Sequence, residues 1–182
     1  MTDDTVSPLQ ALRNRTIVLV GLMGVGKSSV GRRLATALDM PFRDADTEVE
    51  NAAGRSIPEI FADLGEPAFR DGERRVIARL LERGPCVIAT GGGAFVQPDT
   101  AALILAKGVP IWLDSDLETL VERLARNTKR PLLRGGSVRD IVTRMKSERE
   151  PFYAKAPIRV MSDAGPHTAT VNRILEALEP CL

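Results

Sequence analysis

Short apolar runs alternate along this chain with longer segments in which apolar residues recur every three or four positions. The short runs have the continuous hydrophobicity of strands buried on both faces, and the longer segments have the period of amphipathic helices. We predict strands at residues 16–20, 41–44, 86–90, 110–113 and 157–161. We predict helices at residues 27–38, 45–53, 56–64, 66–83, 98–107, 115–126, 137–150 and 168–179.

This alternation predicts an α/β fold in which helices flank a parallel sheet. In such sheets, ligands bind beyond the carboxyl ends of the strands. We therefore expect the chemistry in the segments that directly follow strands, at residues 21–28, 44–46 and 90–93, with 114–116 as a further candidate.

The composition is that of an ordinary globular protein, with 43% hydrophobic and 27% charged residues. A net charge of +1 provides no basic field, so we expect no nucleic-acid partner. No stretch approaches the roughly 20 apolar residues of a membrane span. We expect a flexible N-terminal extension over residues 1–14, without a signal sequence, and a single domain over 15–182. Two cysteines without metal-ligand or redox spacing favour the cytoplasm.

Residues 21–28 read Gly-Leu-Met-Gly-Val-Gly-Lys-Ser, a complete G-x-x-x-x-G-K-[ST] phosphate-binding motif between a predicted strand and a predicted helix. The glycines let backbone N–H groups turn inward around phosphates. Lys27 is expected to reach the β- and γ-phosphates, and the Ser28 hydroxyl to ligate Mg²⁺. The expected ATP-binding residues here are Gly24, Val25, Gly26, Lys27, Ser28 and Ser29. A glycine-rich turn that binds nothing is the alternative, and the strand–loop–helix context argues against it.

Two carboxylates, Asp44 and Asp46, follow the second predicted strand. In one interpretation Asp44 belongs to the magnesium shell and Asp46 accepts a proton from an acceptor hydroxyl. In the other, both are N-caps of the next helix, and the spacing alone does not choose between them. Asp114 is a rival metal ligand, because it ends an apolar strand in the manner of a Walker B aspartate. Ser115 and Asp116 beside it resemble helix caps.

Three successive glycines, Gly91, Gly92 and Gly93, follow the third predicted strand. Such a run is costly in chain entropy, so either a ligand approaches the backbone or the chain makes a tight strand-to-helix turn. Arg130 lies in a polar loop near residues 126–136 that is suited to close as a lid and to stabilise charge on the γ-phosphate. Taken singly, an arginine such as this one is also explained as a solvated surface residue.

Three uncommon residues have simple structural interpretations. Trp112 lies in an apolar strand and is expected in the core, and Cys86 begins a buried strand as a small apolar filler. His167 follows a turn-like Gly-Pro pair and is expected to be solvated.

The ordered set of motifs resembles the shikimate kinase family over about residues 15–179. Its elements are Gly21-x-x-x-x-Gly-Lys-Ser28, Asp44-x-Asp46, Gly54-Arg-Ser-Ile57, Ile60-Phe61, Glu66-x-x-Phe69-Arg70-x-x-Glu73, Gly91-Gly-Gly93 and Arg130-Pro-Leu-Leu133. The resemblance implies the P-loop NTPase fold, a three-layer sandwich with a five-stranded parallel sheet flanked by helices. It also implies transfer of the ATP γ-phosphate to the 3-hydroxyl of shikimate, with Mg²⁺ as cofactor and a monomer as the usual form.

By the same resemblance, Asp46 orients the shikimate hydroxyls and serves as base, and Arg70 and Arg149 bind the carboxylate. The shikimate-binding residues that it implies are Asp46, Phe61, Phe69, Arg70, Gly91, Gly92, Gly93 and Arg149. Arg130 matches the lid arginine of the family and acts in catalysis with Asp46 and Lys27.

The resemblance also implies that Arg126 and Pro166 flank the adenine, and that Asp44 lies in the magnesium water shell, which supports it over Asp114. A kinase for another hydroxy acid, such as gluconate, is the neighbouring possibility. A nucleotide-dependent switch that senses ATP without turnover is a different class, and it would need no acceptor base at Asp46.

Overall fold

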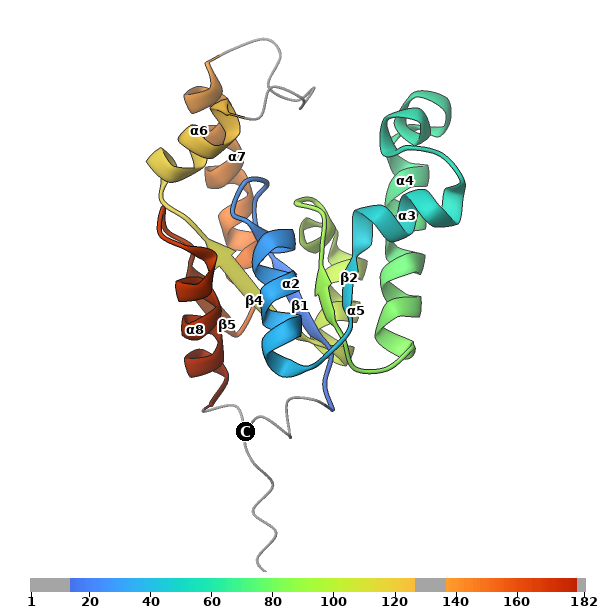
Figure 1. Ribbon diagram of the computed structural model, residues 1–182. Coiled ribbons are helices and arrows are strands. Elements are labelled where there is room, and N and C mark those ends of the chain that lie inside the picture. Colours follow the sequence, from blue (N-terminus) through green and yellow to red (C-terminus); the bar gives the residue numbers. More distant parts are fainter. Residues whose placement is uncertain (1–13, 127–136, 180–182) are drawn as a thin grey trace, which may run out of the picture.

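The computed structural model describes residues 14–126 and 137–179. At its centre is a five-stranded parallel sheet with strand order β2-β3-β1-β4-β5 (Figure 1). The strands are β1 (Ile17–Val20), β2 (Phe42–Asp44), β3 (Val87–Ala89), β4 (Val109–Asp114) and β5 (Ile158–Met161). All five predicted strands are present, and no bound shifts by more than one residue.

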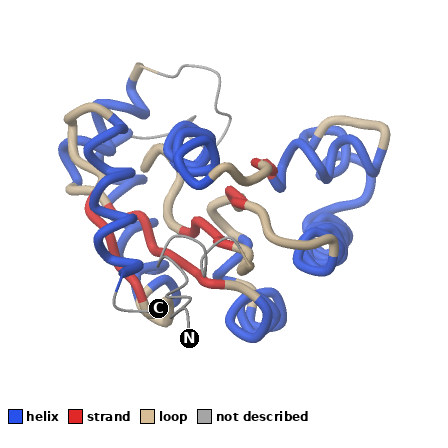
Figure 2. The backbone as a smooth tube through the Cα atoms, turned by 60° about the horizontal axis from the view of Figure 1, so that its bottom comes forward, coloured by secondary structure: helices blue, strands red, loops and turns tan. Residues whose placement is uncertain are grey.

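Helices cover both faces of the sheet and form the outer layers (Figure 2). They are α2 (Lys27–Leu38), α3 (Ala45–Ala53), α4 (Ile57–Glu82), α5 (Pro98–Lys107), α6 (Leu117–Ala125), α7 (Val138–Tyr153), α8 (His167–Leu178) and the short 3₁₀ helix η1 (Ala94–Val96). Helix α2 packs against α8, and α4 against α5. The three-layer α/β fold expected of P-loop proteins is therefore confirmed.

The central strand β1 explains why these strands read as continuous apolar runs. All four of its side chains are fully buried, because it pairs with β3 on one side and β4 on the other. Ile17 lies opposite both Val87 and Val109. Trp112 and Cys86 are also buried, as predicted.

The strand order decides which loops meet. Since β2, β3 and β1 are neighbours and parallel, the segments that follow them leave the same edge of the sheet. Above this edge, α3 and the first half of α4 rise on one side, and α6 and the start of α7 on the other (Figure 1). The phosphate-binding motif, the Asp44–Asp46 pair and the glycine triplet thus share one edge, as the fold class predicts.

Helices α4 and α7 differ most from their predicted bounds. The segments 56–64 and 66–83 form one element, α4, bent at Gly65, whose φ of 79° and ψ of 172° are not helical. Helix α7 continues through Pro151 to Tyr153, although a proline normally weakens a helix interior. Tyr153 is buried, so tertiary packing extends the helix beyond its local signal.

Some expectations fall on residues that are not described. The N-terminal extension, apart from Asn14, and the lid loop with Arg130 lie outside the described residues. Within residues 14–126 and 137–179, no helix has both the length and the apolar character needed to cross a membrane.

Candidate active site

The loop between β1 and α2 has the backbone of a phosphate-binding loop. Gly21, Gly24 and Gly26 have φ angles of 137°, 85° and 94°, which suit glycine. Lys27 is the first residue of α2, so the positive end of the helix faces the loop. Its buried ammonium donates hydrogen bonds to the carbonyl oxygens of Gly21 at 2.7 Å and Leu22 at 2.8 Å. The lysine charge therefore lies inside the loop.

The carboxylate of Asp44 has two roles in the structure. One oxygen accepts hydrogen bonds from the backbone N–H groups of Asp46 and Thr47 and so caps α3. The other accepts a hydrogen bond of 2.6 Å from the Ser28 hydroxyl in the phosphate loop. Capping of α3 by Asp44 is thus confirmed, and its hydrogen bond to Ser28 places the same carboxylate beside the phosphate loop, while its role in the magnesium shell stays a prediction. Asp46 lies inside the first turn of α3 and is not its N-cap.

Asp114, the rival metal ligand, is occupied by cationic side chains. Its Oδ1 accepts hydrogen bonds from Lys146 at 2.5 Å and from the Ser115 N–H at 2.8 Å, and its Oδ2 accepts one from Arg159 at 2.6 Å. Burial raises the pKa of Asp114, but these three donors outweigh it and leave the pKa below its usual value. Ser28 and Asp44 are therefore the better pair of oxygen donors for a magnesium ion, which commonly keeps several waters and takes few protein ligands.

A cavity of about 380 Å³ joins the phosphate loop to the carboxylate of Asp46. Its wall includes Lys27 and Ser28 at one end and Asp46, Gly91 and Gly92 at the other. One space therefore connects the groups expected to bind a phosphate with the group expected to take a proton.

The glycine triplet is explained by polar side chains that lie against its backbone. A Cβ at Gly91 would lie 2.8 Å from Oδ1 of Asp46, and one at Gly92 would lie 3.6 Å from Nη1 of Arg149. A Cβ at Gly93 would overlap the guanidinium of Arg70. Each glycine of the triplet therefore leaves room for a different side chain of the predicted acceptor site.

The buried carboxylate of Glu73 holds Arg70 in place. Glu73 belongs to the Glu66–Glu73 motif, but the sequence predicts no role for it. Nη1 of Arg70 donates to Oε2 of Glu73 at 2.7 Å, and Nε of Arg70 donates to Glu66 at 3.2 Å. Glu73 is only 1% exposed, and burial raises its pKa against the opposing effect of Arg70. The second oxygen of Glu73, Oε1, has no hydrogen-bond partner within the part of the chain that the structure describes.

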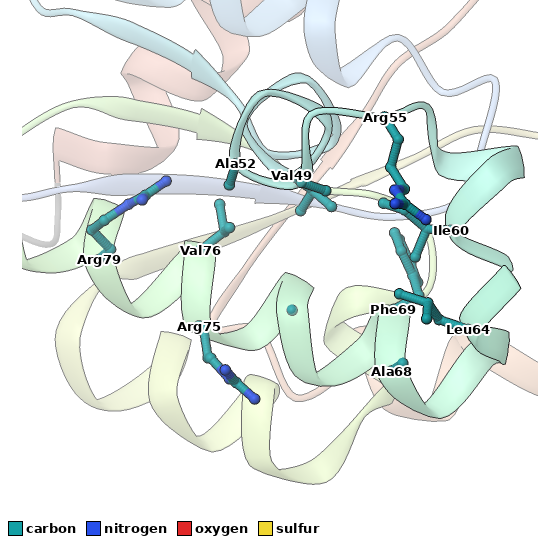
Figure 3. Close-up of a pocket in the computed structure, with 12 residues that line it drawn as sticks. Val49, Ala52, Arg55, Ile60, Leu64, Ala68, Phe69, Arg75, Val76 and Arg79 are labelled. Carbon is teal, nitrogen blue, oxygen red and sulfur yellow. The ribbon is translucent and has the colours of Figure 1, made fainter.

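Phe61 and Phe69, two of the predicted shikimate-binding residues, contact one another, but Phe69 lines a different cavity. The rings of Phe61 and Phe69 have centroids 4.7 Å apart, and Phe61 is partly exposed. Phe69 lines a second cavity of about 540 Å³ between α3 and α4, where Val49 faces Val76 (Figure 3). Phe69 is not among the residues that line the phosphate-loop cavity.

At the nucleotide end, the structure brings in residues that differ from those expected. Arg123 and His167 line the phosphate-loop cavity. Arg123 donates hydrogen bonds to the carbonyl oxygens of Gly24 at 3.4 Å and Val25 at 3.3 Å, and also to that of Asp163. It therefore ties α6 to the phosphate loop.

His167 is only partly solvated, whereas the sequence predicts a solvated side chain. A Cβ at Gly26 would lie 3.2 Å from its Cε1, and its Nδ1 is buried with no hydrogen-bond partner among residues 14–126 and 137–179. Burial lowers the pKa of His167, and the positive charges of Arg123 and Arg33 lower it further. Burial and the neighbouring arginines therefore both favour the neutral form of this imidazole.

Arg126 and Pro166, the residues expected beside the adenine, do not line this cavity. Arg126 is the C-cap of α6, and its largely exposed side chain pairs with Glu122. Pro166 is exposed and is the N-cap of α8, next to His167. The helical period does not distinguish the two arginines, since Arg126 lies seven positions after the buried Thr119 and Arg123 three after the buried Leu120.

Fold and site together define a class of protein. A glycine-rich phosphate loop ahead of a helix, a parallel sheet with this strand order and a carboxylate in the same cavity are the features of an ATP-dependent kinase of the P-loop type. The family model described as shikimate kinase matches residues 23–179. The chain belongs to the shikimate kinase family.

Individual relatives agree with the family model. A shikimate kinase of Novosphingobium aromaticivorans is 59% identical over 172 residues, which cover 92% of this chain and 89% of the relative. One from Caulobacter vibrioides is 58% identical and covers 98% of this chain and 88% of the relative. The solved shikimate kinase of Acinetobacter baumannii in complex with shikimate superimposes with a TM-score of 0.85 at 34% identity, covering 93% of this chain and 96% of that one.

Proposed function

We propose that this protein transfers the γ-phosphate of ATP to the 3-hydroxyl of shikimate, and that Lys27, Asp46, Arg70 and Arg149 carry out the reaction. The observation that carries the assignment of roles is the cavity that joins the phosphate loop to Asp46 and to Gly91 and Gly92 of the triplet. Because phosphoryl transfer needs in-line placement of donor and acceptor more than covalent help from the protein, a shared cavity is the essential requirement.

The donor end binds the triphosphate. Backbone N–H groups at residues 24–29, together with the amino end of α2, surround the phosphates, and the ammonium of Lys27 offsets the charge that develops on the γ-phosphate. Ser28 and Asp44 supply the oxygen atoms for a magnesium ion, which neutralises phosphate charge when it is bound. His167 and Arg123 lie where the rest of the nucleotide leaves the loop.

The acceptor end binds and activates shikimate. Asp46 takes the proton of the attacking hydroxyl, since its carboxylate lines the cavity next to the phosphate loop. The guanidinium groups of Arg70 and Arg149 lie against Gly93 and Gly92, where together they bind the carboxylate of the acceptor. Backbone N–H groups of the triplet donate hydrogen bonds to the acceptor.

Three further features belong to the same proposal. Arg130, from the lid loop, adds positive charge at the transferring phosphate. The enzyme acts as a monomer, and it works in the cytoplasm.

Turnover with matched acids tests the proposal. We expect purified protein with ATP and Mg²⁺ to release ADP rapidly when shikimate is added and not when gluconate is added. Stimulation by gluconate alone would assign the acceptor site to another hydroxy acid. Tight ATP binding without stimulation by either acid would indicate a nucleotide switch and refute the acceptor-site roles.

A further inference from the structure

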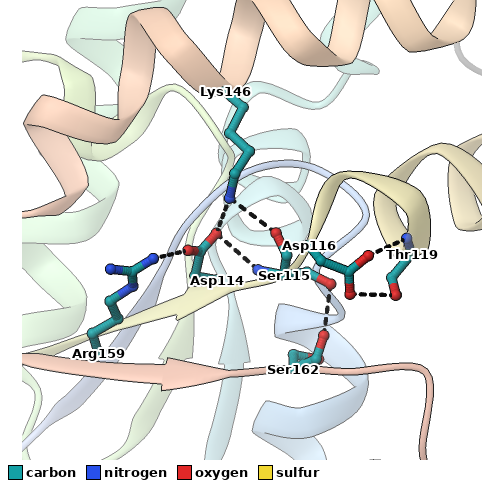
Figure 4. A network of polar contacts seen from close by, with 7 residues as sticks. All are labelled: Asp114, Ser115, Asp116, Thr119, Lys146, Arg159 and Ser162. Carbon is teal, nitrogen blue, oxygen red and sulfur yellow. Dashed lines mark hydrogen bonds and ion pairs between the residues drawn. The ribbon is translucent and has the colours of Figure 1, made fainter.

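A buried carboxylate outside the cavity links the sheet to the helix that bears Arg149. Asp114, at the end of β4, is 2% exposed and forms ion pairs with Lys146 of α7 and Arg159 of β5 (Figure 4). Lys146 also donates a hydrogen bond of 2.9 Å to the carbonyl oxygen of Ser115. The ammonium of Lys146 is thus fixed by two acceptors at the carboxyl edge of the sheet.

Helix α7 has a second attachment point at Tyr153, its last residue. The hydroxyl of Tyr153 donates a hydrogen bond of 2.5 Å to the carbonyl oxygen of Gly92, the central residue of the triplet. The Tyr153 ring packs beside Trp112, with centroids 6.2 Å apart, and the guanidinium carbon of Arg159 lies 4.3 Å from the centroid of the same Trp112 ring. Residues of β4 and β5 therefore support both attachments.

Arg149 lies between these two attachment points. Positions 146, 149 and 153 are spaced by three and four residues, so they share one face of α7. The guanidinium of Arg149 reaches Gly92, where a Cβ would lie 3.6 Å from its Nη1. The position of this guanidinium therefore depends on how α7 is rotated and how far it extends toward the triplet.

The main chain of α7 needs such support. Pro151 lies inside the helix and cannot donate the hydrogen bond that a helical N–H normally makes to the preceding turn. The weakened turn is the one that carries Arg149. Side-chain attachments on either side of it offset that loss.

We propose that the Asp114–Lys146 pair and the Tyr153–Gly92 hydrogen bond form a two-point clamp on α7 that holds Arg149 against the acceptor site. Asp114 and Lys146 are then positioning residues for acceptor binding, and Asp114 is not a metal ligand. The proposal rests on the assignment of Arg149 to the carboxylate of shikimate. It predicts an effect on the acceptor alone, because the residue that the clamp positions, Arg149, lies against Gly92 of the triplet.

A double-mutant cycle on Lys146 and Arg149 tests the clamp. The KM values for shikimate and for ATP are measured in the wild type, Lys146→Met, Arg149→Ala and the double variant. We expect Lys146→Met to raise the KM for shikimate on the order of tenfold, with the KM for ATP unchanged. In the Arg149→Ala background the same substitution should have no further effect, because the group that it positions is gone.

Two variants separate positioning from general stability. Lys146→Arg keeps the cation and should return the KM for shikimate close to the wild-type value. Arg139→Met removes an exposed ion pair between α7 and Glu118 and should leave both KM values unchanged. If Lys146→Met does not fold, Tyr153→Phe replaces it in the cycle, since only one hydroxyl is lost.

Each result has a distinct meaning. If Arg149→Ala raises the KM for shikimate but Lys146→Met does not, the clamp is refuted and the acceptor assignment stands. Additive effects of the two substitutions, or an equal rise in the KM for ATP, would also refute the clamp. If Arg149→Ala leaves the KM for shikimate unchanged, both the role of Arg149 and the clamp are wrong.

Discussion

Asp46 and Glu73 place their carboxylates against the same backbone position, from two different helices. A Cβ at Gly91 would lie 2.8 Å from Oδ1 of Asp46 and 3.0 Å from Oε1 of Glu73. The negative charge of Asp46 adds to the effect of burial in raising the pKa of Glu73. Asp46, the proposed base, therefore acts on Glu73, the partner of Arg70, across a single glycine.

Replacing this glycine should disturb catalysis more than folding. In Gly91→Ala the new methyl group meets only the ends of two side chains, so the carboxylates shift while the backbone stays. We expect kcat to fall by up to about 10²-fold, as for a misplaced catalytic group, with little change in Tm. The matched control is Gly72→Ala in α4, a position with open space around it. This variant should raise the free energy of unfolding by about 0.5–1 kcal/mol without loss of turnover.

The charge of Asp46 is expected to be essential for turnover. Asp46→Asn keeps the shape of the side chain but cannot accept the hydroxyl proton, so we expect kcat to fall by about 10²–10⁴-fold. Steady-state ADP release with saturating ATP and shikimate measures the loss. Acceptor-dependent turnover at the wild-type rate would remove Asp46 as the base.

Glu73 should make stability depend on pH with a definite sign. Its folded-state pKa lies above the usual value, so the folded state binds the proton more tightly than the unfolded state does. As pH rises from about 4.5 through the raised pKa, wild-type protein should lose stability relative to Glu73→Gln. Urea unfolding of both proteins across this window gives the difference in the free energy of unfolding, and parallel profiles would contradict the prediction.

Lys27 should contribute mainly to the transition state. In Lys27→Met the chain length is similar but the ammonium inside the phosphate loop is lost. We expect kcat to fall by at least about 10²–10³-fold, with shikimate still bound in calorimetric titrations. Full activity would refute the assignment of the phosphate loop.

The nucleotide end offers a direct comparison of two arginines on one helix. Arg123→Met removes hydrogen bonds to the carbonyl oxygens of Gly24 and Val25 and should raise the KM for ATP. Arg126→Met removes an exposed pair with Glu122 and should leave that KM unchanged, as surface ion pairs contribute little. The opposite ranking in the same ADP assay would restore Arg126 as the nucleotide contact.

Local sequence rules located most of the fold because they act over short distances. Period and β-branched runs gave each strand to within two residues, and the glycine loop was complete in eight positions. They were weaker where packing overrides local preference, as in α7, which runs through Pro151 because Tyr153 is buried. The contact of Arg123 with the phosphate loop was missed for the same reason, since it joins residues 98 and 99 positions apart. The adenine contact of Arg126 stays a prediction.

The sequence by itself therefore determined the α/β class, the phosphate loop and the family of motifs, because each of these is written in neighbouring residues. Only the tertiary structure decided how the motifs are used. The strand order brings Asp44 to Ser28, and it surrounds Asp114 with Lys146 and Arg159 so that this carboxylate is anchored rather than open. These partners are 16, 32 and 45 residues apart along the chain, and contacts over such separations depend on which strands become neighbours, which no local pattern specifies.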